Sequence, residues 1–290
     1  MASKFKVFLE MIKFEHTIFA LPFAYMGAFL AVWYRSNGQS ALPTAAQFIY
    51  ITLAMVGART AAMSLNRLAD RYIDALNPRT AGRAIPAGAL GVLEVWVYTI
   101  LSFAVLIFSA LQLSPLAVKL LPITVIALLG YSYTKRFTWL CHVALGIAIG
   151  IAPMGSWVAI TNSLDLSAWL LGLAVAFWIA GFDIIYACQD FEFDKKNGVY
   201  SIPARFGIKA ALYISSAFHV VAAILLLSLG IQLNLGVIYF VGYVIAVAIL
   251  YYEHTLVKPH DLSKLNMAFM NMNGYLSTLM FVFTLGELFL

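Results

Sequence analysis

Three residues with oxygen-bearing side chains recur at four-residue intervals where one apolar run ends. Asn66, Asp70 and Asp74 occupy positions i, i+4 and i+8. Each four-residue step along an α-helix turns by only about 40°, so the three side chains would share one helix face. Arg59 lies seven residues earlier, inside the apolar run and about 20° from that face. A charged residue at such a depth needs a partner or a polar cavity.

A second cluster of aspartates lies more than a hundred residues further along the chain. Asp183, Tyr186, Asp190 and Asp194 occupy positions i, i+3, i+7 and i+11, which predicts one stripe along a helix. Asp183 would lie about two turns inside an apolar run. Asp190 and Asp194 would lie at the mouth of the same helix.

Together the two clusters predict a magnesium-assisted site for a diphosphate. Pairs of carboxylates that face one space repel each other unless a cation lies between them. Mg²⁺ takes one or two carboxylates together with substrate phosphate, and nearby basic side chains would contact the phosphate directly. For one cluster alone, the alternative is a solvated loop in which Arg71 pairs with Asp70 or Asp74. Two aligned clusters disfavour that alternative.

The elements that must position these clusters are membrane helices. Of the 290 residues, 63% are hydrophobic and 11% are charged, whereas a soluble domain is about a quarter charged. A crossing needs about 20 mostly apolar residues, and such runs predict nine helices around a central cavity. We therefore expect an all-α membrane protein with a single transmembrane domain over residues 1–290. The runs lie near residues 16–34, 46–66, 92–112, 116–134, 139–161, 168–189, 209–229, 234–252 and 267–288.

Basic residues predict the orientation of this bundle. On one side of the membrane the loops carry only Arg35 and Asp165 as charges, whereas the other loops and the N-terminus hold nearly all the rest. Basic loops stay in the cytoplasm, which predicts an inner (cytoplasmic) membrane protein whose N-terminus and clusters face the cytoplasm. Because the basic residues serve orientation, no nucleic-acid partner is expected despite the net charge of +5. Lys135 and Arg136 share the cytoplasmic face with both clusters.

These motifs resemble the UbiA superfamily of intramembrane prenyltransferases. The first family motif, NDxxDxxxD, is similar to residues 66–74, and its usual continuation, RTxxRPLPxG, is similar to residues 79–88. The second motif, roughly DxxYxxxDxxxD, is matched by residues 183–194. Arg59 matches a common family position, and residues 131–136 resemble the family's Y-x-x-x-K-R. The resemblance extends over the whole chain.

The resemblance implies Mg²⁺-dependent transfer of a polyprenyl group from polyprenyl diphosphate to a hydroxylated aromatic acid of the 4-hydroxybenzoate type, within membrane lipid and for ubiquinone synthesis. Metal ligands are then expected to be Asn66, Asp70, Asp74, Asp190 and Asp194. Catalytic residues would be the same four aspartates together with Asp183. Substrate contacts would be Arg59, Arg67, Arg79, Arg83, Tyr131, Lys135, Arg136 and Tyr186.

One residue departs from the family pattern. Arg67 stands where the motif usually has Asp or Asn, which removes one possible carboxylate ligand and could instead supply a contact to diphosphate. The same chemistry on a dihydroxynaphthoate, for menaquinone, is the alternative acceptor. The alternative from another class is an ion-coupled secondary transporter with Arg59 and Asp183 as a coupling pair. Acidic residues at one mouth rather than at the midplane disfavour transport.

Overall fold

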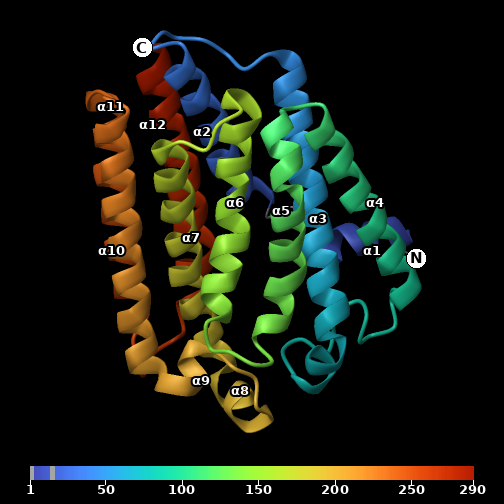
Figure 1. The fold of residues 1–290 in the computed structure, drawn as a ribbon. Coiled ribbons are helices and arrows are strands. Elements are labelled where there is room, and N and C mark those ends of the chain that lie inside the picture. Colours follow the sequence, from blue (N-terminus) through green and yellow to red (C-terminus); the bar gives the residue numbers. More distant parts are fainter. Residues whose placement is uncertain (1–2, 14–16) are drawn as a thin grey trace.

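The chain folds into a bundle of upright helices. A computed structural model describes residues 3–13 and 17–290. Over these residues the secondary structure is helical, apart from an isolated β-bridge between Lys258 and Asp261. Most of the helices run nearly parallel, and the two short helices α8 and α9 cap one end of the bundle (Figure 1). The predicted all-α class is confirmed.

The described helices follow in chain order. The α-helices are α1 (Lys4–Met11), α2 (Thr17–Arg35), α3 (Ala45–Leu76), α4 (Val92–Leu111), α5 (Pro115–Thr134), α6 (Cys141–Thr161), α7 (Leu166–Ala187), α8 (Phe191–Asn197), α9 (Ile202–Phe206), α10 (Ile208–Gln232), α11 (Val237–Leu256) and α12 (Asn273–Phe289). A 3₁₀ turn, η2 (Cys188–Asp190), precedes α8, and a π-helix, η3 (Met267–Met272), precedes α12.

Local sequence explains where several helices begin. Thr44 and Gln47 form a capping box at the start of α3, in which each side chain accepts the other residue's backbone N–H. Ser114 caps α5 and is followed by Pro115 at the first helical position, where the missing N–H of proline has no cost. These signals leave the long apolar segments between them free to run as uninterrupted helices.

The predicted membrane crossings correspond to helices. Among the described residues, seven helices are long and apolar enough to span a membrane, so the protein is an integral membrane protein. The predicted run near 267–288 corresponds to η3 and α12, and the run near 16–34 to α2, which begins at Thr17. Residue 16 lies outside the described residues. Nine crossings and a cytoplasmic N-terminus stay predictions.

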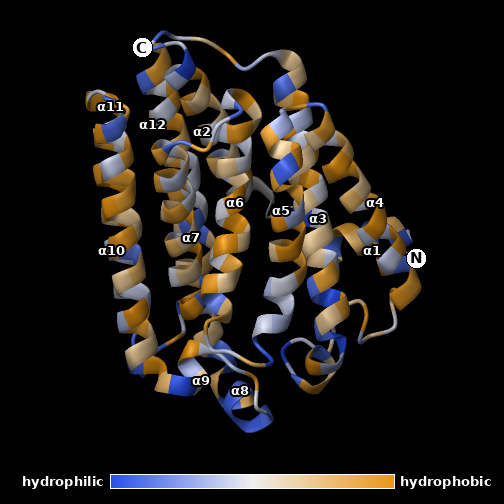
Figure 2. Ribbon diagram, in the orientation of Figure 1, coloured by the Kyte–Doolittle hydropathy of each residue, from blue (hydrophilic) through white to orange (hydrophobic). Residues whose placement is uncertain are grey.

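Polar residues gather at one end of the bundle. Hydrophilic residues are concentrated around α8, α9 and the segment that follows α3, while the helices above them are largely apolar (Figure 2). Both aspartate clusters lie towards this end because they occupy the last turns of α3 and the region from α7 to α8. The expectation that both clusters face the same side is therefore confirmed by the fold.

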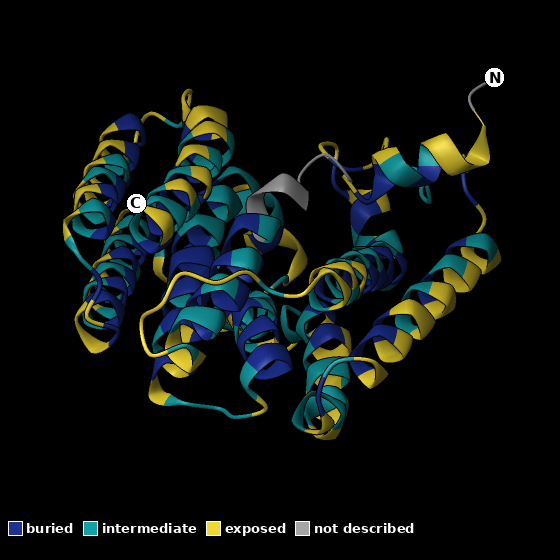
Figure 3. Ribbon diagram, turned by 90° about the horizontal axis from the view of Figure 1, so that it is seen from above, coloured by how far each residue is buried: buried dark blue, intermediate teal, exposed yellow. Residues whose placement is uncertain are grey.

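The segment Leu166–Asn197, which contains α7, is the centre of the bundle. In the most apolar 18-residue stretch of this segment, 67% is buried, whereas in that of α5 only 11% is buried. Viewed along the bundle, buried residues concentrate on the inward faces and exposed residues on the outer ones (Figure 3). The exposed apolar faces of the outer helices match what a lipid environment requires. The largest core cluster joins residues of α2, α3, α6, α7, α10, α11 and α12.

Small residues let α6 and α7 pack at backbone contact. A side chain at Gly146 would place its Cβ 2.2 Å from the carbonyl oxygen of Ala176, and one at Gly150 would come within 2.4 Å of that of Gly172. The spacing of Gly146 and Gly150 is the G-x-x-x-G pattern of close helix pairs in membranes. The close approach brings the start of α6 beside the end of α7.

Replacing Gly150 with alanine is expected to destabilise the fold by about 1–3 kcal/mol, because the new Cβ overpacks a backbone contact. Thermal unfolding of the purified protein in detergent would measure the loss. Gly155→Ala on the same helix is the matched control, since its Cβ would meet nothing within 4 Å. Equal melting temperatures for the two variants would contradict the close contact between α6 and α7.

The second aspartate cluster does not lie on one continuous helix. The predicted helix near 168–189 ends at Ala187, and η2 joins it to α8. A 3₁₀ turn has about 3.0 residues per turn instead of 3.6, so it changes the register between Asp183 and the last two aspartates. The predicted uninterrupted stripe is therefore wrong, although all its members still line one cavity.

Candidate active site

The polar end of the bundle opens into a cavity of about 950 Å³. Along the chain from η2 back into α7, its lining changes from Asp190 and Asp183 to Ile179 and Val175. The cavity is therefore charged near its mouth and apolar at depth. This combination fits a ligand with an anionic head and a hydrocarbon tail.

The first cluster lines the cavity from one face of α3, as its spacing predicts. Asn66, Asp70 and Asp74 all contribute to the wall, and the two aspartates are only 1% and 4% exposed. The carboxylate of Asp70 accepts a hydrogen bond from Asn66 Nδ2 at 3.1 Å. It also forms ion pairs with Lys135 and, at 3.2 Å, with Arg136. Two basic residues that directly follow α5 thus neutralise one buried carboxylate.

Arg71 does not take part in these ion pairs. Its guanidinium donates to the carbonyl oxygen of Leu68 at 2.7 Å and to the hydroxyl of Tyr72 at 3.2 Å. The solvated-loop alternative, in which Arg71 pairs with Asp70 or Asp74, is therefore wrong. The basic partners come instead from other parts of the chain, which draws the two aspartates into a shared site.

The segment after α3 folds back over Asp74. Arg83 pairs with Asp74 Oδ1 at 2.6 Å, and the Thr80 hydroxyl donates to the Asp74 carbonyl oxygen at 3.0 Å. The second oxygen, Asp74 Oδ2, is buried and has no hydrogen-bond partner among the described residues. A buried unpartnered carboxylate oxygen is costly, which makes this atom a candidate ligand for a cation.

The same segment connects the first cluster to the second. Asn77 Nδ2 donates to Asp190 Oδ1 at 2.9 Å, and Arg79 forms a bidentate pair with the Asp190 carboxylate at 2.9 and 2.5 Å. Arg79 also donates to the hydroxyl of Tyr186 at 3.0 Å. Burial lowers the pKa of Arg79, but its hydrogen bonds to Asp190 and Tyr186 outweigh this and raise the pKa above its usual value. Arg79 is therefore charged at any working pH.

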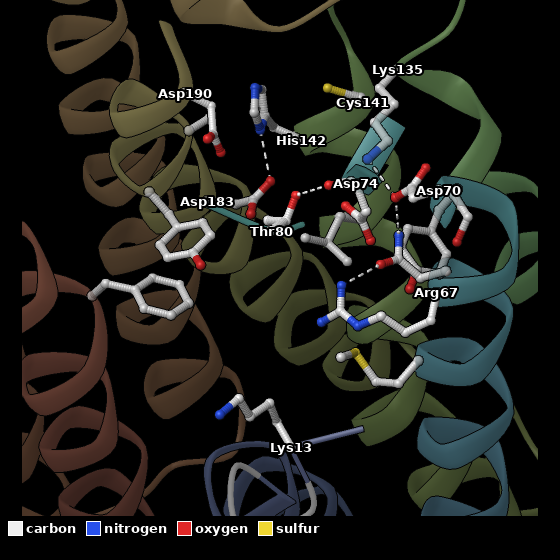
Figure 4. A pocket seen from close by; sticks show the side chains of 18 of the residues that line it. Lys13, Arg67, Asp70, Asp74, Thr80, Lys135, Cys141, His142, Asp183 and Asp190 are labelled. Atoms are coloured by element: carbon white, nitrogen blue, oxygen red, sulfur yellow. Dashed lines mark hydrogen bonds and ion pairs between the residues drawn. The ribbon is translucent and has the colours of Figure 1, made fainter. Parts of the chain in front are cut away.

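All four residues of the second cluster line the cavity. Asp194 is 8% exposed and accepts a hydrogen bond from the Ser201 hydroxyl at 2.9 Å. In Figure 4, Asp190 and Asp183 lie on the side of the cavity opposite Asp70 and Asp74. The carboxylates thus face one another across a shared space, from elements far apart in the sequence.

The C-terminal end of α5 forms a third wall. Tyr131 and Lys135 line the cavity, and Tyr131 donates its hydroxyl to the carbonyl oxygen of Ala62 at 3.2 Å. Arg136 lies outside the lining. It donates to the carbonyl oxygen of Ala69 at 2.6 Å and holds Asp70 from behind. The predicted substrate contact by Arg136 would therefore act through Asp70 in this structure.

Arg59 holds the N-terminal helix in place. It lines the cavity, and its guanidinium donates to the carbonyl oxygens of Ile12 at 3.2 Å and Lys13 at 3.1 Å, at the C-terminal end of α1. The intramembrane charge that the sequence singles out therefore has backbone partners. Its place in the cavity wall keeps it a candidate for contact with an anionic ligand.

Arg67 also points into the cavity (Figure 4). It donates to Asn66 Oδ1 at 3.3 Å and to the carbonyl oxygen of Met11 at 3.5 Å. The Arg67 guanidinium thus lies where the family motif usually has Asp or Asn, as the sequence indicates. It adds positive charge beside the first cluster, which favours an anionic ligand there.

His142 is a site residue that the sequence did not indicate. It is 3% exposed, lies in the first turn of α6, lines the cavity and contacts Asp183 with its Nδ1 at 2.7 Å from Oδ2. A lone histidine in an apolar run has no distinguishing spacing. The available signal was Asp183 itself, because an intramembrane carboxylate requires a partner and His142 begins a neighbouring helix at the same end.

The donor set fits a magnesium ion held together with a diphosphate. The described residues contain no group of three or more His, Cys, Asp or Glu side chains arranged to hold a metal by themselves. Mg²⁺ prefers a different arrangement, with one or two carboxylates and the remaining oxygens from water and phosphate. The unpartnered Oδ2 of buried Asp74 and the hard oxygen donors on both walls meet that preference.

Aromatic side chains line the cavity from its charged end to its apolar depth. The Phe269 ring of η3 lies 4.2 Å from that of Tyr186, and Trp178 lies 5.0 Å from Phe23. Trp178 Nε1 donates to Asn273 Oδ1 at 2.7 Å. The indole is therefore fixed at the junction of α2, α7 and α12, where it lines the cavity with its apolar surface.

Comparison with known sequences gives consistent matches. A model of the UbiA prenyltransferase family matches residues 20–275. A 4-hydroxybenzoate octaprenyltransferase of Pseudoalteromonas translucida (strain TAC 125) is 32% identical over 253 residues, covering 87% of this chain and 85% of that protein. A protein of the same name from Paraburkholderia xenovorans (strain LB400) is 29% identical over 210 residues, which is 71% of each chain.

Solved structures show the same architecture. The apo structure of a UbiA homolog from Aeropyrum pernix K1 superposes with a TM-score of 0.83 at 34% identity, covering 93% of this chain and 96% of that one. A UbiA homolog from Archaeoglobus fulgidus, bound to GPP and Mg²⁺, superposes with a TM-score of 0.73 at 19% identity, covering 98% and 100%. The second likeness is one of fold.

Proposed function

The chain belongs to the UbiA prenyltransferase family and is a prenyltransferase; we propose that it transfers a polyprenyl group to the ring of a hydroxylated aromatic acid, with Mg²⁺ as cofactor. The donor would be a polyprenyl diphosphate. As a member of this family the protein is an enzyme, and the alternative of an ion-coupled transporter is set aside.

One observation carries the proposal. Carboxylates from α3 and from the α7–α8 region face one cavity that is charged at its mouth and apolar at depth. A diphosphate head with divalent cations suits the charged end, and a hydrocarbon tail suits the apolar end. The GPP and Mg²⁺ bound to the homolog from Archaeoglobus fulgidus support this choice of ligands.

The two aspartate clusters are the proposed cation ligands. Asn66, Asp70 and Asp74 would act from α3, with Asp190 and Asp194 from the opposite wall. Bound there with the substrate, Mg²⁺ would supply positive charge to the leaving diphosphate and so favour ionisation at the allylic carbon. The protein's own part is to hold the head group and to exclude water from the ionised carbon.

Basic residues of the same walls are the proposed contacts to diphosphate. Lys135, Arg79 and Arg83 already lie at the carboxylates of the two clusters, so small side-chain rotations would bring them to phosphate oxygens. Arg67 adds a further guanidinium beside them, and Arg136 supports Asp70 from behind. Guanidinium groups bind phosphate with two parallel hydrogen bonds.

The acceptor would bind deeper than the diphosphate. Arg59 is the proposed partner of its carboxylate, and Asp183 would orient the ring hydroxyl and take its proton. Tyr131 and Tyr186 would face the allylic cation with their rings. Each of these four residues lines the cavity.

In the proposed reaction the prenyl group moves from the diphosphate oxygen to a ring carbon of the acceptor. The allylic C–O bond breaks and its electron pair leaves with diphosphate. The ring carbon beside the hydroxyl supplies the electron pair of the new C–C bond while the hydroxyl proton passes to Asp183. Aromaticity returns when the substituted carbon loses its proton and the ring oxygen is protonated again. The net products are the prenylated acid, diphosphate and one proton.

The names of the relatives support 4-hydroxybenzoate as the acceptor, and with it a place in ubiquinone synthesis. A dihydroxynaphthoate, for menaquinone, is the second candidate, because the same carboxylate and hydroxyl would meet Arg59 and Asp183. We place the enzyme in the inner membrane with its site facing the cytoplasm, from the loop charges.

The test is a direct assay. Purified protein in detergent, supplied with Mg²⁺, geranyl diphosphate and 4-hydroxybenzoate, should release diphosphate and form the C-prenylated acid, as detected by mass spectrometry. A parallel reaction with the dihydroxynaphthoate ranks the two acceptors by kcat/KM. Release of diphosphate without a prenylated product from either acid would contradict the proposed acceptor class.

A further inference from the structure

The contact between His142 and Asp183 lies beside the proposed acceptor. Neither residue is among the proposed ligands of Mg²⁺. His142 begins α6 and Asp183 lies one turn before the end of α7. Their facing atoms, Nδ1 and Oδ2, are 2.7 Å apart. The histidine is almost fully buried, whereas the side chain of Asp183 is 24% exposed, towards the cavity. One group is thus a fixed support and the other is accessible to a ligand.

A backbone amide determines which nitrogen of His142 carries the proton. The N–H of Ile202 points at Nε2 from 3.2 Å. An amide N–H can only donate, so Nε2 must present its lone pair. In a neutral imidazole the proton then lies on Nδ1. His142 therefore donates to Asp183, and Asp183 accepts with Oδ2.

This arrangement leaves one oxygen of Asp183 for a ligand. Among the described residues, His142 is the hydrogen-bond partner that the structure gives Asp183, and it occupies Oδ2. The carboxylate is thereby held in one rotamer with Oδ1 available to the cavity. A carboxylate that accepts one fixed hydrogen bond is pre-oriented for a second.

We propose that His142 is a positioning residue for the acceptor, which holds Asp183 as an oriented carboxylate facing the hydroxyl of the aromatic ring. The inference rests on the proposed function, since it assigns a partner to the residue that receives the hydroxyl proton. His142 does not take that proton itself, because Ile202 occupies Nε2 and Nδ1 already carries one. Its contribution is geometric.

Two substitutions of similar size separate this role from others. The side-chain amide of His142→Gln offers one N–H for Asp183 and one oxygen for the Ile202 amide, but it cannot titrate. The side chain of His142→Met is equally long and offers neither. A partner that orients a functional group typically contributes 10- to 100-fold to activity, as the outer partners of metal ligands do.

In the assay described above, His142→Met is expected to lower kcat by about 10- to 100-fold, with the KM for prenyl diphosphate unchanged within about threefold. His142→Gln should restore kcat to within about threefold of wild type. Asp183→Asn combined with His142→Met should be no slower than Asp183→Asn alone, because the two residues act as one unit. A purely structural role would not give this split or this rescue.

Three results would overturn the inference. They are a wild-type kcat for His142→Met, a His142→Gln variant as slow as His142→Met, and additive effects of the Asp183 and His142 changes. Melting curves in the same detergent identify variants that do not fold, and His142→Ala then replaces His142→Met. If wild type itself forms no prenylated acid, the proposed function fails instead.

Discussion

Changing Asp190 to asparagine should reduce prenyl transfer by at least about 10²- to 10³-fold, as removal of one preorganised electrostatic group does in other enzymes. The side chain keeps its shape and one carbonyl oxygen, but it loses the charge that attracts a cation. Asp70→Asn should have an effect of the same size from the opposite wall. Initial rates of diphosphate release and of product formation, at saturating Mg²⁺, measure both.

Glu192→Gln is the matched control for Asp190→Asn. It lies two residues away in α8, is exposed and does not contribute to the cavity wall, so its rate should equal that of wild type. The Arg79 and Lys135 side chains that lose a charged partner are 33% and 27% exposed, and water can replace part of the interaction. Both variants should therefore fold. Wild-type rates in folded Asp70→Asn and Asp190→Asn would refute the metal site.

Removing Mg²⁺ should abolish transfer as completely as the aspartate changes do. The described residues offer no cluster of three or more ligating side chains, so the cation would be held weakly until a diphosphate supplies further oxygens. A chelator in excess over Mg²⁺ should stop the reaction within the mixing time, and added Mg²⁺ should restore it. Ca²⁺ should restore little, because it demands more oxygen ligands at longer distances.

The concentration of Mg²⁺ that the reaction needs tests whether the cation and the diphosphate bind together. If cation and diphosphate bind together, the Mg²⁺ concentration for half-maximal rate should fall as prenyl diphosphate is raised. A chelator pre-mixed with an equal amount of Mg²⁺ is the control for direct inhibition by the chelator. Undiminished activity in excess chelator would exclude the proposed role of the cation.

Residue spacing alone predicted the elements that carry charge. The four-residue interval of Asn66, Asp70 and Asp74 requires a helix face, and α3 continues as a helix through Leu76 as this interval demands. The apolar runs predicted the helices because lipid leaves few other backbone structures. Local pattern is enough where each element satisfies its own hydrogen bonds.

The sequence could not predict which side chains of distant helices and loops contact each other. Asp190 binds Asn77 and Arg79. Neither segment has a local sequence pattern that predicts contact with the other. The sequence also does not predict the break in the helix at η2, because Cys188 and Gln189 are compatible with a helix. His142 was missed for the same reason: the residue that explains it, Asp183, lies on the next helix and its distance depends on the glycine contacts between α6 and α7.

The ion pairs at the mouth of the cavity have a consequence for what the protein can admit. Asp70, Asp74 and Asp190 each already hold a basic partner, so these three carboxylates carry little uncompensated charge in their low-dielectric surroundings. A lone cation would be repelled by these ammonium and guanidinium groups, and a lone anion would be repelled by the carboxylates. A magnesium diphosphate brings both signs at once and lets the two sets of side chains exchange partners. We therefore expect the site to bind the complex of Mg²⁺ and diphosphate more tightly than either component alone.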